Sequence, residues 1–163
     1  MEYIDIVNEE DNVIGQRTQE EVYQQHLRHR IVHVVLFRSN GNMVLQKRSA
    51  KKSFCPLHWV TAGSGHVQAG ETYAIAAQRE LEEEVGIQGE LQHFKKDTFE
   101  GGGLQKFLGT FEMTSDDPVR MNTLEVESVG EFSLHQIKDM LASGEKFHPE
   151  FLFLLQKYYL PTV

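Results

Sequence analysis

Four glutamates lie within five consecutive positions of the chain, at Glu80, Glu82, Glu83 and Glu84. On a helix, Glu80, Glu83 and Glu84 are three or four residues apart and share one face, whereas Glu82 points away from them. Hard oxygen donors within reach of one another suit Mg²⁺ or Mn²⁺. A solvent-exposed acidic face is the alternative for the same residues. The spacing favours a divalent-metal site on a helix.

A helix that positions these carboxylates is predicted from Thr72 to Val85, a stretch without Gly or Pro. Gly86 stands where a C-cap glycine is expected. Leu81, Val85 and the Ala74–Ala77 segment are expected to form the packed face on the other side. The sequence therefore predicts a helix with one buried and one acidic face.

Arg79 is expected to have a structural role beside these carboxylates. Its guanidinium can form a bidentate pair with Glu71 or Glu83 and hold the acidic side chains in place. Glycines before the helix allow the backbone to turn tightly and approach a ligand, at positions Gly63, Gly65 and Gly70. A backbone carbonyl in this loop is a further candidate metal ligand.

The elements around this helix are predicted from hydrophobic periodicity and turn residues. Strands are expected at residues 3–7, 13–14, 31–38, 43–48, 91–100, 105–113 and 125–133, with loop and short strand over 51–66. Helices are expected at residues 18–29, 72–85, 134–143 and from 149 onward, the last with Phe151, Leu154, Leu155 and Tyr158 on its apolar face. Capping boxes at Thr18–Glu21 and Ser133–Gln136 mark two helix starts, and Gly144 ends the third helix. This order favours a layered α/β domain.

Composition limits the classes of function. The chain has 163 residues and a net charge of −8, which argues against a nucleic-acid polymer or an anionic membrane as partner. Cys55 is the only cysteine, so neither an intramolecular disulfide nor a cysteine-based zinc cluster is expected. The longest apolar run, FLFLL, is far shorter than the roughly 20 residues that span a bilayer. The polar N-terminus lacks the pattern of a secretory signal, and a cytoplasmic location is expected.

Residues 65–87 match the pattern G-x5-E-x7-R-E-U-x-E-E-x-G-U, where U is a bulky aliphatic residue, at every fixed position. This stretch resembles the Nudix box, the signature of hydrolases that act on diphosphates linked to another moiety. The order of elements over residues 31–160 is similar to a whole Nudix domain. The segments IDIVNEEDNVIGQRT and LRHR look most like the Nudix branch related to isopentenyl-diphosphate isomerase.

The resemblance implies roles for individual residues. Glu80, Glu83 and Glu84 would bind Mg²⁺ or Mn²⁺, with Glu83 or Glu84 bridging two ions and the Ser64 carbonyl completing the shell. Glu71 and Arg79 would orient these ligands, and Gly65 and Gly86 would have structural roles. A later glutamate, Glu125 or in reserve Glu127, would serve as ligand or base. The catalytic candidates are Glu83, Glu84 and Glu125.

Two further groups are candidates for the site. The one dense basic patch, formed by Lys47, Arg48, Lys51 and Lys52, is a candidate for contacting a substrate phosphate or an ordinary polar strand end. His29 and His66 fall where isopentenyl-diphosphate isomerases have metal-binding histidines. Each is otherwise expected to be a surface or core residue.

Two departures separate the chain from the isomerases. Ser64 stands where that family has its catalytic cysteine, and Cys55 lies nine residues earlier. Residues 101–105 are glycines, Leu104 and Gln105, where a later glutamate would be expected. Isomerisation is therefore the alternative, beside a non-catalytic nucleotide-binding module, which usually lacks the box glutamates.

The sequence as a whole predicts one Nudix domain, an α/β/α sandwich around a mixed β-sheet. It would span residues 1–163, with a hairpin and short helix over about 1–30 and the core over about 31–160. The predicted activity is metal-dependent hydrolysis of a diphosphate linkage in a nucleoside diphosphate derivative or related small molecule, by water attack at phosphorus. A homodimer is left open, and the pattern does not identify the substrate.

Overall fold

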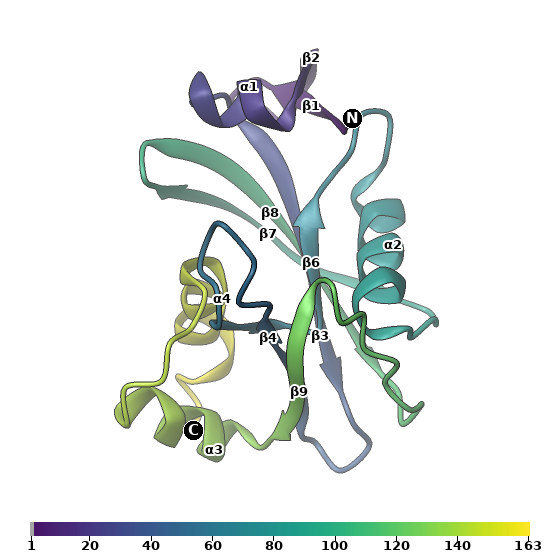
Figure 1. Cartoon of the computed structure of the whole chain (residues 1–163), viewed down its shortest axis with the longest axis vertical. Helices are drawn as coiled ribbons and strands as arrows, with labels where there is room; N and C mark the ends of the chain where they lie inside the picture. Colours follow the sequence, from purple (N-terminus) through teal and green to yellow (C-terminus); the bar gives the residue numbers. More distant parts are fainter. Residues whose placement is uncertain (1) are drawn as a thin grey trace.

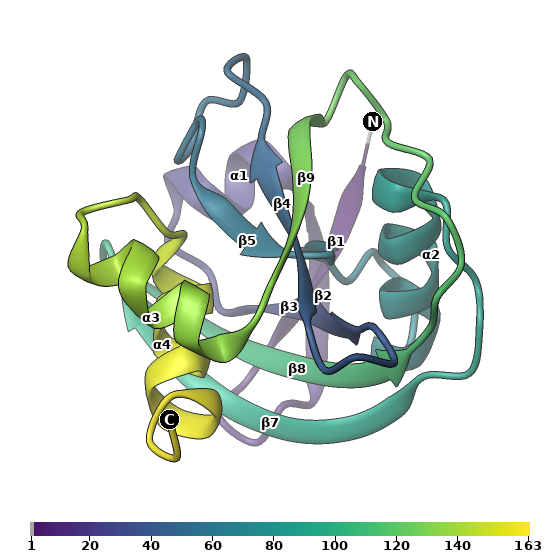
Figure 2. The same ribbon diagram turned by 90° about the horizontal axis from the view of Figure 1, so that it is seen from below.

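The computed structural model describes residues 2–163, which form a two-stranded N-terminal sheet and a larger mixed β-sheet with helices on both faces (Figures 1 and 2). The strands are β1 (Tyr3–Val7), β2 (Val13–Thr18), β3 (His29–Phe37), β4 (Met43–Arg48), β5 (Trp59–Thr61), β6 (Gly63–His66), β7 (Gln92–Gly101), β8 (Leu104–Thr114) and β9 (Val126–Phe132). The helices are α1 (Gln19–Gln24), α2 (Tyr73–Val85), α3 (Leu134–Ala142), α4 (Pro149–Leu154) and the π-helix η1 (Leu155–Tyr159).

Strand β3 is the centre of the larger sheet, in which the strand order is β5-β4-β3-β8-β7. It pairs in parallel with β8 and antiparallel with β4 and β6, while β9 pairs with β4. The sheet is therefore mixed. Helix α2 covers one face, and α3 and α4 cover the other (Figure 2). The predicted α/β/α sandwich is confirmed.

The run of apolar residues in β3 supplies both cores because neighbouring side chains point to opposite faces of a strand. Val32, Val34 and Leu36 pack in the core beneath α2. Val35 packs in the other core, beneath α3 and α4. A strand buried on both faces explains why the sequence here is continuously apolar rather than alternating.

Helix α2 has the predicted start and end. The Thr72 side chain accepts a hydrogen bond from the backbone of Ile75, and Gly86 ends the helix in the left-handed conformation, with φ at +70°. Leu81 and Val85 are buried as expected. Ala74 is exposed instead of packed, because the buried face of α2 begins one residue past Ile75.

Helix α1 is shorter than the predicted 18–29. It ends at Gln24, and His26 adopts a left-handed conformation with φ at +53°. This conformation breaks the helix and releases residue 29 to start β3. Both predicted capping boxes, at Thr18 and Ser133, are present.

The last helix differs from the prediction in its second half. Pro149 occupies its first turn as expected, but from Leu155 the chain continues as a π-helix. Tyr159 is buried in this segment, and the predicted Tyr158 is half-buried against the same core. The Tyr158 hydroxyl donates to Asp97 at 2.8 Å. Among residues 2–163, no helix combines the length and apolar character needed to cross a bilayer.

Candidate functional site

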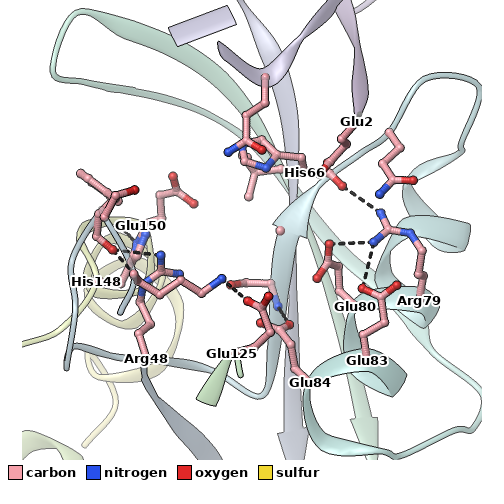
Figure 3. A pocket seen from close by; sticks show the side chains of 18 of the residues that line it. Glu2, Arg48, His66, Arg79, Glu80, Glu83, Glu84, Glu125, His148 and Glu150 are labelled. Carbon is pink, nitrogen blue, oxygen red and sulfur yellow. Dashed lines mark hydrogen bonds and ion pairs between the residues drawn. The ribbon is translucent and has the colours of Figure 1, made fainter. Parts of the chain in front are cut away.

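A cavity of about 560 Å³ is lined on one side by residues of β6 and α2, and on the other side by residues of β4, β8 and α4 (Figure 3). This volume is in the range of small-molecule sites. The structure brings together at this cavity ten of the predicted site residues, which are Arg48, Lys52, Ser64, Gly65, His66, Arg79, Glu80, Glu83, Glu84 and Glu125.

Arg79 holds the acidic side of the cavity together. Its guanidinium donates to both oxygens of Glu71, at 2.7 and 2.8 Å. Its third nitrogen donates to Glu80 at 2.9 Å and, more weakly, to Glu83 at 3.4 Å (Figure 3). It also donates to the His66 carbonyl at 3.1 Å. One planar cation therefore links the start of the box to the helical carboxylates.

Strand β6 approaches α2 closely, and glycine is required for this approach. A Cβ at Gly65 would overlap the Glu80 carboxylate, and one at Gly63 would lie 2.9 Å from the Leu81 Cα. These two positions let the strand backbone line the carboxylates directly. These two glycines therefore determine how closely β6 approaches the carboxylates of α2.

Glu84 is the most buried of the predicted metal ligands, with only 7% of the residue exposed. One oxygen accepts from the Ser64 backbone N–H at 2.8 Å, and the other accepts from Gln46 at 3.0 Å. Burial raises the pKa of Glu84 well above its usual value, and the neighbouring Glu80 raises it further. A carboxylate oxygen has a second lone pair, so both oxygens retain acceptor capacity.

Glu80 and Glu83 differ in their surroundings. The Glu80 side chain is 14% exposed, and burial raises its pKa to about 7 despite the opposing charge of Arg79. The Glu83 side chain is 55% exposed. Arg79 contacts both carboxylates, and residues 2–163 contain no group of three His, Cys, Asp or Glu side chains already arranged around a metal position. The donor set still fits a hard divalent cation, which would relieve the repulsion between Glu80 and Glu84.

The basic patch is divided by the fold. Arg48 and Lys52 line the cavity, where Arg48 donates twice to the Phe54 carbonyl. Lys52 forms an ion pair with Glu125. Lys47 is not among the cavity-lining residues, and its ammonium lies 5.0 Å from the centre of the Trp59 ring.

The two candidate late glutamates are separated in the same way. Glu125 lines the cavity through its contact with Lys52, whereas Glu127 is exposed on β9 and is not among the lining residues. Residues 125 and 127 both flank the buried Val126, and it is the contact with Lys52 that distinguishes Glu125.

His29 and His66 lie against each other, with stacked rings 5.6 Å apart. The His29 Nδ1 donates to the Leu27 carbonyl at 2.9 Å, and the Tyr23 hydroxyl contacts the His66 Nε2 at 2.7 Å. Burial lowers the pKa of His29 to about 4 and that of His66 to about 3, so both rings are neutral near pH 7. His66 lines the cavity, and their role as metal ligands stays a prediction.

The polar residues at the cavity that the sequence analysis missed include Lys106, His148 and Glu150. They lie across the hollow from the box glutamates, as the labelled side chains of His148 and Glu150 show (Figure 3). Lys106 sits in an apolar strand and Glu150 in a helical turn, and neither belongs to a recognisable motif. Only the packing of α4 against β3 and β8 brings them together.

Comparison with known proteins agrees with this architecture. A family model described as the NUDIX domain matches residues 27–155. The uncharacterized Nudix hydrolase YfcD of Escherichia coli is 32% identical over 152 residues, which cover 93% of this chain and 83% of that protein. An uncharacterized Nudix hydrolase of Yersinia pestis is 40% identical over 89 residues, 55% of this chain and 49% of the relative, so the match spans about half of that protein.

A crystal structure of the DR0079 protein from Deinococcus radiodurans superposes with a TM-score of 0.83. It is 27% identical in sequence, and the match covers 97% of this chain and 99% of that one. The complete box, the sandwich around a mixed sheet and the family model over most of the chain lead to one conclusion. This chain belongs to the NUDIX domain family.

Proposed function

We propose that this protein hydrolyses a diphosphate linkage in a small molecule with the help of Mg²⁺ or Mn²⁺. One observation carries the proposal: the three box glutamates Glu80, Glu83 and Glu84 line one cavity, and two of them are buried beside each other. Carboxylates in this arrangement are costly unless a cation is shared between them. Relatives named Nudix hydrolases support the same reaction class.

The predicted site residues have different roles in the proposed reaction. Glu80, Glu83 and Glu84, together with the Ser64 carbonyl, would hold the divalent ion, which would lower the pKa of the attacking water and neutralise charge on the phosphoryl group. Glu71 orients Arg79, and Arg79 positions the carboxylates. Their ion pair fixes the geometry without contacting the substrate.

Glu125 is the proposed acceptor of the proton from water. It lies at the cavity on a segment separate from α2, and Lys52 holds its carboxylate there. A carboxylate so placed can take a proton while the box glutamates stay committed to the ion. Arg48 and Lys52 are proposed to contact a substrate phosphate.

The test separates metal binding from proton transfer. Phosphate release is measured with Mg²⁺ across nucleoside diphosphate derivatives, dinucleoside polyphosphates and prenyl diphosphates, and Mn²⁺ affinity is measured by calorimetry. Glu83→Gln should lower both rate and affinity, whereas Glu125→Gln should lower the rate by about 10²-fold with unchanged affinity. The matched control is Glu82→Gln, an exposed neighbour that faces away from the cavity.

The absence of turnover on every compound, or full activity of Glu83→Gln, would refute the hydrolase. Isomerisation is disfavoured because Cys55 is not among the cavity-lining residues and Ser64 takes the position of the catalytic cysteine. The single-domain boundary, the isomerase-like branch, the cytoplasmic location and a homodimer stay predictions.

A further inference from the structure

The wall opposite the box glutamates carries a buried charge cluster, which we call the far-wall cluster: His33, Lys106, His148 and Glu150. Glu150 is its centre, with a side chain that is 5% exposed. One of its oxygens contacts the His33 Nε2 at 2.9 Å, and the other contacts the Lys106 ammonium at 2.8 Å. Burial opposes ionisation of Glu150, but these two neighbours hold its pKa well below the usual range. The carboxylate is therefore charged.

His33 joins the cluster through both of its ring nitrogens. The Nδ1 contacts the Thr61 hydroxyl at 2.9 Å. The Nε2 faces the Glu150 carboxylate at 2.9 Å, and since a carboxylate only accepts, this nitrogen is the donor. One oxygen of Glu150 is therefore occupied by His33.

Lys106 has hydrogen-bond donors that Glu150 does not use. Its side chain is only 9% exposed, and its ammonium has three N–H groups, of which one donates to Glu150. A buried polar group without a partner is costly. Lys106 and Glu150 both line the cavity, so acceptors for the remaining N–H groups can come from a ligand.

His148 adds a neutral donor to the same wall. Its Nδ1 accepts from the Glu150 backbone N–H at 3.2 Å, so that nitrogen is unprotonated. Burial lowers the pKa of His148 to about 3, which keeps the ring neutral and leaves its proton on Nε2. Within residues 2–163 no acceptor pairs with this Nε2–H. Both oxygens of Glu150 already accept, so the wall presents donors to the cavity.

We propose that Lys106 and His148 bind a second phosphate of the substrate, carried by the moiety remote from the cleaved diphosphate; this rests on the proposed function above. The cavity then has an acidic end that takes the metal-bound diphosphate and a donor end that takes the remote phosphate. At about 560 Å³ it is large enough for a nucleotide-sized molecule to reach both ends. The substrate class is a diphosphate bearing an additional phosphate monoester.

The test uses pairs of diphosphates that differ by one remote phosphate: coenzyme A against dephospho-coenzyme A, and NADPH against NADH, each with Mg²⁺. We expect kcat/KM to be about 10-fold higher or more for the phosphorylated member of at least one pair, since charge-assisted hydrogen bonds are the stronger ones. Lys106→Met should remove that preference mainly through KM, and leave the other member within about threefold.

Two variants guard against a loss of folding. His148→Ser keeps an oxygen that can accept from the Glu150 N–H but removes the Nε2–H donor, and should reduce the preference in the same direction. The control is Lys157→Met, which breaks a lysine–carboxylate pair with Asp97, at 2.6 Å, outside the cavity and with a more exposed lysine. It should retain the full preference.

Equal kcat/KM within both pairs, or an equal loss on both members in Lys106→Met, overturns the inference while leaving hydrolysis standing. If no member is hydrolysed, binding of inorganic phosphate is titrated by calorimetry in EDTA. Binding by the wild type that Lys106→Met abolishes supports the anion site even as the hydrolase proposal fails. No binding by the wild type overturns the site as well.

Discussion

Glu150→Gln removes the buried negative charge that pairs with Lys106 and accepts from His33. His33, Lys106 and Glu150 have side chains that are 1%, 9% and 5% exposed, so solvent cannot replace the lost carboxylate. Removing one partner of a buried ion pair costs about 3–5 kcal/mol. For a chain of this length, each kcal/mol lowers the melting temperature by about 2–4 °C, so we expect a decrease of roughly 6–20 °C at pH 7.

The cost of this substitution should depend on pH. Glu150 has a lower pKa in the folded protein than in the unfolded chain, because His33 and Lys106 favour its charged form against the effect of burial. Its contribution is fully present above the ordinary value of 4.5 and is lost as pH falls through the folded pKa. The difference between wild type and Glu150→Gln should therefore shrink by up to about 1.4 kcal/mol per pH unit below that value.

Urea denaturation at pH 7 and pH 3.5, followed by the fluorescence of Trp59, measures both effects. Trp59 is the only tryptophan and is 8% exposed, so its emission reports unfolding. The companion variant Lys106→Met leaves the His33–Glu150 pair intact and should cost less, roughly 1–3 kcal/mol. A loss below about 1 kcal/mol for Glu150→Gln at pH 7, or an undiminished loss at pH 3.5, would refute the charged cluster.

Three further outcomes are expected. Burial raises the pKa of Glu80 to about 7, and a metal binds the ionised carboxylate. The apparent Mn²⁺ affinity should therefore fall by up to about tenfold per pH unit below 7. An affinity that does not change with pH in calorimetry would contradict this. Leu81→Ala should cost about 2–5 kcal/mol in urea denaturation, since the side chain is fully buried; a loss under about 1 kcal/mol would show that the core closes over the gap. Gly86→Ala should lower the free energy of unfolding by more than about 1 kcal/mol, because residue 86 has φ at +70° and the added Cβ would lie 2.9 Å from that of Arg120. The loss should exceed that of Gly41→Ala, where φ is +89° but the added Cβ has no neighbour. Equal losses would exclude the contact with Arg120 as a cause.

Local signals in the sequence predicted most of the elements. Strand β4 has the predicted bounds, and α2 ends at the predicted C-cap Gly86, while its predicted first residue, Thr72, is the N-cap. These features depend on neighbouring residues alone: a side chain that caps the helix start and a glycine that ends it. The prediction was incomplete at the end of the chain, where the π-helix buries Tyr159 beside the half-buried Tyr158.

The spacing of the box glutamates also determined their common location. Residues three and four apart must share a helix face, so the placement of Glu80, Glu83 and Glu84 at one cavity follows from helical geometry. Their separate environments do not follow from it. Glu84 is buried because Gln46 and Ser64 enclose it, and those residues come from strands whose position depends on the whole sheet.

The far side of the cavity was decided by tertiary structure alone. Lys106 reaches it because β8 pairs in parallel with β3, and Glu150 reaches it because α4 packs on the same sheet more than forty residues later in the chain. No local pattern marks either residue, since a lysine in a strand and a glutamate in a first helical turn are ordinary. The sequence by itself determined the acidic half of the proposed site, for which we propose metal binding, because its residues are neighbours on one helix. The donor half exists only once long-range strand pairing and the packing of α4 bring His33, Lys106 and Glu150 together.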